Sequence, residues 1–170
     1  MQLDALALSQ DENTSAEILD QISTDENPFV RIRVAAHLNT SPQTLVKLSE
    51  DEVPLVQQFV AEHLSTPVET LLALSEDSDL VYWIAGNPNT PVELLNKFAR
   101  GEDETIRSSV AVNPSTPVGR LERLSEDENE DVRTAVAKNP LTPVEILDKL
   151  SSDENEAVRE AVAANPNKPA

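Results

Sequence analysis

A block of 26 residues recurs along the chain, and this repeat limits the fold more than any other feature. Five blocks align without gaps, and one block is two residues shorter. The blocks are residues 11–36, 37–62, 63–86, 87–112, 113–138 and 139–164, with partial units at 1–10 and 165–170. Repeat periods of this length are typical of solenoids, in which each unit packs against its neighbours. We therefore expect a single solenoid domain over residues 1–170.

The first part of each block has the pattern of a capped helix. A Thr occupies one position in all six blocks, and Pro follows it in four of them. Three residues after the Thr comes Glu or Gln, except at Gly119. Thr at the N-cap, Pro at the first helical position and Glu three residues later form a capping box. Five residues after the Thr comes an invariant Leu: Leu19, Leu45, Leu71, Leu95, Leu121 and Leu147.

The second part of each block predicts a shorter helix that follows a polar loop. Asn27, Asp103, Asn129 and Asn155 stand where this helix needs an N-cap. An apolar residue and then an invariant Ala follow at fixed positions: Val34–Ala35, Val60–Ala61, Ile84–Ala85, Val110–Ala111, Val136–Ala137 and Val162–Ala163. The dipeptide Asn-Pro then ends the helix in most blocks, because a residue before Pro is disfavoured in the α region.

The frame NPxTPxELLxxL…D…VRxAVAxNP, clearest in residues 113–140 and 139–166, resembles the leucine-rich repeat variant family. The resemblance covers about residues 11–166. It implies an all-α, right-handed α-solenoid of about six repeats, with α-helices alternating with 3₁₀-like helices and no β-sheet. The family is associated with a cysteine-rich iron–sulfur segment, but this chain has no Cys, so we expect no cofactor. The family supplies no catalytic residues, and its general role is macromolecular interaction.

The composition excludes several classes of function. There are 31 acidic and 13 basic residues, a net charge of −18, which disfavours nucleic acid as a partner. The absence of Cys excludes disulfides, thiol nucleophiles and thiolate metal sites. The chain has no apolar run long enough to span a membrane, and its start lacks the basic stretch of a signal peptide. We therefore expect a cytoplasmic protein.

The polar loops and the start of the second helix carry charged positions. The loop acids Asp25, Asp51, Asp77, Asp127 and Asp153 share one position, and Arg31, Arg107, Arg133 and Arg159 share another. We interpret the acids as helix punctuation, with a ridge for a basic partner or a divalent-cation site as the alternative. We expect the arginines to form structural ion pairs with the loop acids. This pairing is not obligatory, because Asp51 and Asp77 remain where Gln57 and Val81 replace Arg.

Two histidines, His37 and His63, occupy the position that Asn takes in later repeats. Equivalent residues one repeat apart should lie about 10 Å from each other, which is too far for two ligands of one ion. We interpret both as turn-capping residues, and we assign no metal-binding and no catalytic residue.

The aromatic residues are the candidate binding site. Trp83 shares its position with Arg33 and Phe59, and Tyr82 lies beside it. These positions vary between repeats, so Arg33, Phe59, Tyr82 and Trp83 could line up as a protein-binding stripe. The alternative is that Trp83 fills space left by the shortened loop at residues 78–80.

The sequence favours a non-enzymatic scaffold that presents an acidic solenoid surface to another protein. A basic protein would match the charge of this surface. Repeats two to four are the preferred contact region. The alternative is an acidic mimic of nucleic acid that occupies a basic groove of its partner, and the third reading is a helical-repeat enzyme. The sixth repeat has no polar cap, so we also expect either a longer parent protein or end-to-end self-association through the C-terminal repeat.

Overall fold

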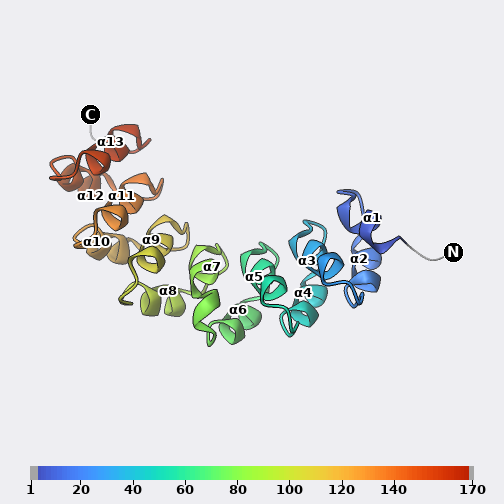
Figure 1. Ribbon diagram of the computed structural model, residues 1–170. Helices are drawn as coiled ribbons and strands as arrows, with labels where there is room; N and C mark the ends of the chain where they lie inside the picture. Colours follow the sequence, from blue (N-terminus) through green and yellow to red (C-terminus); the bar gives the residue numbers. More distant parts are fainter. Residues whose placement is uncertain (1–3, 169–170) are drawn as a thin grey trace. The chain divides into compact units, whose positions relative to one another are not determined.

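The computed structural model describes residues 4–168, and these residues form helices and turns without a strand (Figure 1). They pack as two compact units, one ending at Asn89 and the other starting at Thr90, and each is described by itself. The first helices of the repeats are α2 (Ala16–Ile22), α4 (Pro42–Leu48), α6 (Val68–Leu74), α8 (Val92–Phe98), α10 (Val118–Leu124) and α12 (Val144–Leu150). The second helices are α3 (Pro28–Ala36), α5 (Pro54–Glu62), α7 (Val81–Gly86), α9 (Glu104–Val112), α11 (Glu130–Lys138) and α13 (Glu156–Ala164).

The repeated apolar positions form the core of each unit, as predicted. All six Leu residues of the first-helix position are fully buried, among them Leu45 and Leu121. Full burial of such a Leu contributes roughly 2 kcal/mol. The Val or Ile and the Ala of the second helix are also fully buried in the first five repeats. An Ala at this position leaves room for the second helices of successive repeats to pack closely.

The conserved Thr caps a different helix from the one we expected. Its Oγ1 donates to the carbonyl oxygen six residues earlier, near the end of the preceding second helix, at 2.5–2.7 Å. This bond recurs at Thr14, Thr40, Thr66, Thr116 and Thr142. The capping-box prediction is therefore wrong. In four repeats the N-cap is instead Pro, for example Pro143 with ψ of 152°, an extended conformation that places it before the helix.

The N-caps of the second helices are confirmed. Asn27, Asp103, Asn129 and Asn155 each accept a backbone N–H two residues later. The 3₁₀ character implied by the resemblance is wrong for most second helices, because among the described residues the only 3₁₀ helix is η1 (Ser78–Leu80). It forms in the shortened loop, where Leu80 is buried at the position that Val30 and Val56 fill in earlier repeats.

The N-terminal helix α1 (Ala5–Gln10) is the second helix of a partial repeat. Leu8 O accepts the Thr14 hydroxyl, as Val34 O accepts that of Thr40. Asp11 takes the position of His37 and accepts the Asn13 N–H at 3.0 Å. These bonds give residues 4–10 the same 26-residue register as the rest of the chain, a register that the sequence pattern alone did not define.

Candidate functional site

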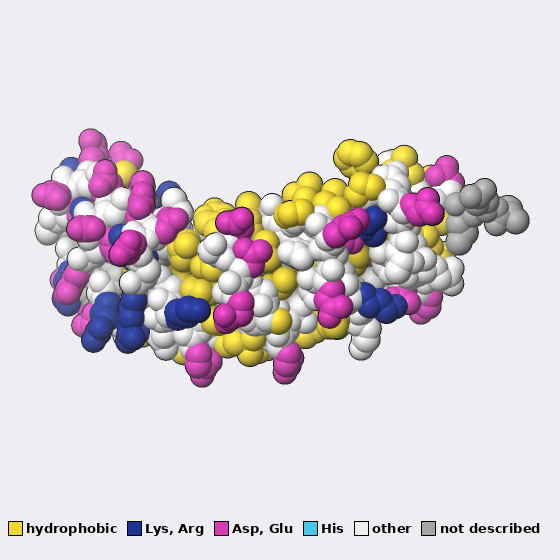
Figure 2. Space-filling model, turned by 60° about the horizontal axis from the view of Figure 1, so that its bottom comes forward, with side chains coloured by type: hydrophobic (Ala, Val, Ile, Leu, Met, Phe, Trp, Pro, Cys, Tyr) yellow, Lys and Arg dark blue, Asp and Glu magenta, His cyan; other side chains and the backbone are white. Residues whose placement is uncertain are grey.

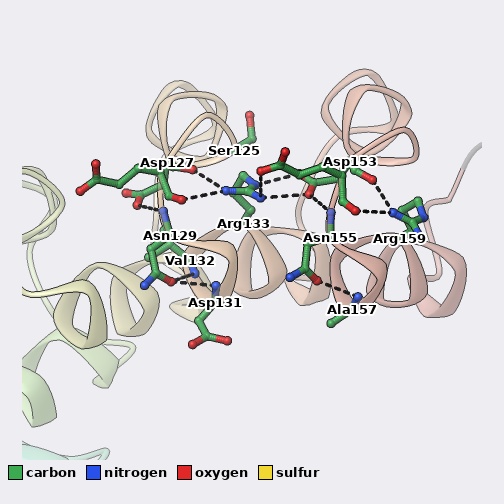
Figure 3. A network of polar contacts seen from close by, with 12 residues as sticks. Ser125, Asp127, Asn129, Asp131, Val132, Arg133, Asp153, Asn155, Ala157 and Arg159 are labelled. Carbon is green, nitrogen blue, oxygen red and sulfur yellow. Dashed lines mark hydrogen bonds and ion pairs between the residues drawn. The ribbon is translucent and has the colours of Figure 1, made fainter.

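Arginines at the start of the second helices connect successive repeats (Figure 3). Arg133 donates from Nε and Nη2 to the Asp153 carboxylate at 2.7 and 3.0 Å. Its Nη1 donates to the carbonyl oxygens of Asp127 and Glu128 in its own loop. Arg31 and Arg107 make the same set of bonds, to Asp51 and Asp127 respectively. We call Arg31, Arg107 and Arg133 with their carboxylates the arginine ladder.

The expected pairing with the loop acids is confirmed, but each Arg pairs with the acid of the following repeat. This register explains why Asp51 is kept although its own repeat has Gln57: Asp51 binds Arg31. It also explains why two charges are missing together. Val81 replaces the Arg of the third repeat, and Gly101 replaces the Asp of the fourth repeat that this Arg would bind. Arg159 donates to the carbonyls of Asp153 and Glu154, and no carboxylate lies within ion-pair distance of it among residues 4–168.

The loop acids that the arginines bind, Asp51, Asp127 and Asp153, hold successive repeats together, and we call them the inner acids. The hydrogen bonds from Arg133 lower the pKa of Asp153 although burial opposes this, and the same bonds raise the pKa of Arg133. Beside each inner Asp lies an acid that faces solvent, such as Glu52 and Glu154, whose side chains are 92% and 91% exposed. The outer acids are therefore the accessible part of the loops, although Glu52 and Glu154 also lie 4.0 and 3.8 Å from Nη2 of Arg31 and Arg133.

A second row of side-chain bonds connects the turns between repeats. Asn87 and Asn139 donate from Nδ2 to the carbonyl oxygens of Ala61 and Ala111, one repeat earlier, each at 2.7 Å. His63 bonds in the same way: its Nε2 lies 3.0 Å from His37 O, and its Nδ1 accepts the N–H of Ser65. The turn-capping interpretation of the histidines is confirmed. Burial lowers the pKa of His63, which keeps it in the neutral form that this geometry needs.

The four candidate binding residues lie on the second helices α3, α5 and α7. Arg33 is exposed and lines a surface cavity of about 520 Å³ with His37. Phe59 and Trp83 are partly exposed. The Tyr82 ring, 44% exposed, meets the Trp83 ring edge to face at 4.8 Å. Within the described residues no cation–π contact joins Arg33 to Phe59, and the role of the four residues in binding stays a prediction.

Four further exposed hydrophobic residues accompany them, and sequence reasoning missed these. Phe29 and Leu38 are 68% and 83% exposed on and just after α3, and Leu55 and Leu64 are 43% and 63% exposed on and just after α5. Phe29 and Leu55 stand at the position of Thr105 in the fourth repeat, and Leu38 and Leu64 stand at the position of Pro114 in the turn that follows it. A comparison of repeats at these two positions could have found them. Hydrophobic side chains gather along the edge of the molecule formed by this part of the chain (Figure 2).

Other site chemistries are not visible in the described part of the chain. Residues 4–168 contain no group of three or more His, Asp or Glu side chains placed to hold a metal ion. No helix among them has the length and apolar character needed to cross a bilayer.

The stacked helix pairs define the class of this protein, an α-solenoid repeat protein. Its fold is similar to that of a solved leucine-rich repeat variant, which agrees with the resemblance seen in the sequence. A solved leucine-rich repeat variant, described as a novel repetitive structural motif, superposes with a TM-score of 0.63 at 28% identity over 93% of this chain. The chain spans 64% of the length of that protein.

A second similar structure is the X-ray structure of YibA from Escherichia coli. It superposes with a TM-score of 0.56 at 19% identity, covering 95% of this chain and 74% of YibA, and it supports the fold alone. No protein-family model matches the chain, and no curated protein matches it.

Proposed function

We propose that the protein is a non-enzymatic scaffold that binds another protein through the second-helix surface of its first compact unit. The observation that carries this proposal is a set of exposed and partly exposed hydrophobic side chains. They stand at positions where other repeats have polar or small residues or Pro. We call this set the apolar face: Phe29, Leu38, Leu55, Phe59, Leu64, Tyr82 and Trp83. Exposed hydrophobic groups of this extent mark interaction surfaces.

The spacing of the residues supports one continuous surface within this unit. Phe29 and Arg33 are four residues apart on α3, and Leu55 and Phe59 have the same spacing on α5. Residues four apart lie on the same side of a helix. In the second unit the position of Phe59 is taken by small residues, for example Ala135, which is buried. The large side chains of the first unit are therefore additions to the repeat and not part of its core.

The charge around the apolar face supports a basic partner. The first 89 residues hold 15 of the 31 acids and only three of the 13 basic residues. Two of the three, Arg31 and Lys47, are already bound to Asp51 and Asp20. A hydrophobic surface in a unit with this excess of acids is complementary to an amphipathic segment that carries Lys and Arg. We propose such a segment as the ligand.

The test uses substitutions of exposed side chains, which leave the core intact. The double variant Leu38→Asn/Leu64→Asn removes two exposed leucines, and Leu141→Asn is the matched control, because Leu141 is 53% exposed in a turn of the second unit. Partners captured from native lysate are identified, purified and titrated while the fluorescence of Trp83, the only Trp, is recorded. We expect wild type and Leu141→Asn to bind equally and the double variant to lose at least tenfold in affinity. Equal affinity of all three would refute the proposal.

The nucleic-acid mimic is the second candidate, and the exposed outer acids favour it. Replacing Glu52 and Glu154 by Gln removes two carboxylates that point to solvent and bond to no backbone amide. A mimic would lose affinity in this variant and keep it in Leu38→Asn/Leu64→Asn. The hydrophobic scaffold predicts the reverse order.

We also propose self-association through α13. Ala163 is exposed, whereas its counterparts in the first five repeats are fully buried against the next repeat. Arg159, also on α13, has no carboxylate within ion-pair distance among residues 4–168, whereas its counterparts Arg31, Arg107 and Arg133 each bind one. These two residues give α13 an open stacking surface.

A further inference from the structure

The basic residues of this acidic chain are unevenly distributed. Ten of the 13 Lys and Arg residues lie from residue 90 onward. Four of them lie on or beside α8 and α10, and we call them the cationic patch: Lys97, Arg100, Arg120 and Arg123. Figure 2 shows Lys and Arg side chains gathered on the part of the molecule that carries α8 and α10.

The cationic patch is not a requirement of the repeat. Arg120 stands at a position that is apolar or Thr in all the other repeats: Ile18, Thr44, Thr70, Leu94 and Ile146. The preceding residue, Gly119, replaces the Glu or Gln of the other five repeats. A Cβ built at Gly119 would meet no atom within 4 Å, and its φ is not positive, so neither packing nor backbone conformation demands glycine. One repeat thus gains a cation and loses an acid at adjacent positions, and the space beside Arg120 stays open.

The charges of the cationic patch are not neutralised within the described chain. Arg120 donates from Nε and Nη2 to Asn96 Oδ1 at 3.1 and 2.7 Å, a neutral acceptor. None of the four cations has a carboxylate within ion-pair distance among residues 4–168. The neighbouring Glu122 lies 3.9 Å from a different cation, Lys149.

The three arginines lie close enough to repel one another. Partial burial lowers the pKa of Arg120, and repulsion from Arg100 and Arg123 lowers it further. Clustered guanidinium groups of this kind cost free energy in the absence of an anion. The bidentate geometry of Arg matches carboxylate and phosphate oxygens.

We propose that the cationic patch binds an acidic, carboxylate-rich segment of a partner protein. A short acidic segment is favoured over nucleic acid or an anionic membrane, because the chain carries a net charge of −18 and repels an extended polyanion that reaches beyond the patch. A peptide whose charge is limited to the width of two helices meets the four cations and few of the acids. This surface lies in the second compact unit, so it is separate from the apolar face and prefers ligands of the opposite charge.

The test measures binding of a rhodamine-labelled oligoglutamate peptide by fluorescence anisotropy, first in dilute buffer and then at physiological salt. The key variant, Gly119→Glu/Arg120→Ile, restores residues that other repeats carry at these positions, so it is expected to fold. Gly119→Glu alone adds one carboxylate and removes no contact. The matched control is Lys138→Ala, which removes an exposed cation of α11 outside the patch. An uncharged oligoserine peptide, a single-stranded oligonucleotide and phosphatidylserine vesicles serve as alternative ligands.

We expect saturable binding of oligoglutamate that weakens with salt, falls about tenfold in the double variant and less in Gly119→Glu, and is unchanged in Lys138→Ala. Oligoserine should not bind. Absence of oligoglutamate binding at low salt, or equal binding by the double variant and Lys138→Ala, would overturn the proposal. Tighter binding of the oligonucleotide or the vesicles than of oligoglutamate would overturn the assignment of the partner class. None of these outcomes depends on the apolar face, so the two proposals succeed or fail separately.

Discussion

Replacing Arg133 by Gln should destabilise the protein far more than the same change at Arg159. Both arginines donate to two carbonyl oxygens of their own loop, and only Arg133 also binds a carboxylate, that of Asp153. Gln57 shows what the shorter side chain keeps, because its Nε2 donates to Asp51 O at 2.8 Å. Each substitution also removes one positive charge, so the effect on overall repulsion is matched.

The difference between the two variants measures the carboxylate bond. The side chains of Arg133 and Asp153 are 10% and 8% exposed, so the substitution leaves a nearly buried carboxylate without its cation. Breaking such a pair costs about 3 kcal/mol, whereas loss of exposed bonds at Arg159 costs less than about 1 kcal/mol. The double variant Arg133→Gln/Asp153→Asn should recover part of the loss, because it removes the unpaired charge.

The assay is urea denaturation followed by circular dichroism at neutral and acidic pH. Because the pKa of Asp153 is lowered in the fold, its contribution is complete above the unfolded pKa of about 3.9 and is lost as pH falls through the folded value. The gap between wild type and Arg133→Gln should therefore shrink below about pH 4. Equal destabilisation by the two Gln variants at neutral pH, or a gap that does not change with pH, would refute the reasoning.

Three further predictions concern stability and assembly. Thr142→Val should lower the free energy of unfolding by about 1 kcal/mol, because Val136 O loses the Thr142 hydroxyl and keeps only the N–H of Asn139. Thr134→Val should raise it by about as much, because the buried Thr134 Oγ1 has no partner in the described structure. Urea denaturation of both variants checks the opposite signs. Burial lowers the pKa of His63 in the fold, so as pH falls the unfolded chain takes up a proton before the folded chain does. The contribution of His63 to stability should therefore be complete above about pH 6.5 and decrease below it. Thermal melts of His63→Asn, which carries the residue of later repeats, should lack this decrease of stability with falling pH. Light scattering should show mass rising with concentration for wild type and not for Ala163→Glu, and a monomer at all concentrations would contradict self-association.

The repeat allowed most of the fold to be predicted. Helix positions, the buried Leu and Val–Ala positions and the N-caps of the second helices follow from local periodicity and capping chemistry, and the structure has them. The prediction that the second helix is the shorter one is wrong: α3, α5, α9, α11 and α13 have 9 residues, whereas the first helices have 7. The Thr hydroxyl was assigned to the wrong helix because a hydroxyl both donates and accepts. Only the path of the chain through the turn shows that Thr142 faces the end of α11 and not the start of α12.

Contacts between repeats were harder to predict than contacts within them. The sequence predicts that the repeated Arg and Asp residues form ion pairs. Whether Asp51 binds an Arg of its own repeat or of the previous repeat depends on how the repeats stack. The candidate binding surfaces have the same difficulty. Leu38 and Leu64 take the position of Pro in the later Asn-Pro turns, which a comparison of repeats reveals, but their exposure is known only from the structure.

The arginine ladder has a consequence for how the repeat number can change. Each Arg and its carboxylate belong to consecutive blocks, so duplication or deletion of a block that carries both, such as residues 113–138, joins an Arg to an equivalent Asp and leaves no buried charge unpaired. A point substitution of either partner has no such compensation: where Gln57 replaces Arg, Asp77 of the next block is kept and is exposed. The joint absence of charge at Val81 and Gly101 is the pattern that two such changes leave. The number of repeats can therefore change by whole blocks of this kind without unpairing a buried charge, whereas loss of one Arg leaves the Asp of the next block either exposed, as at Asp77, or replaced, as at Gly101.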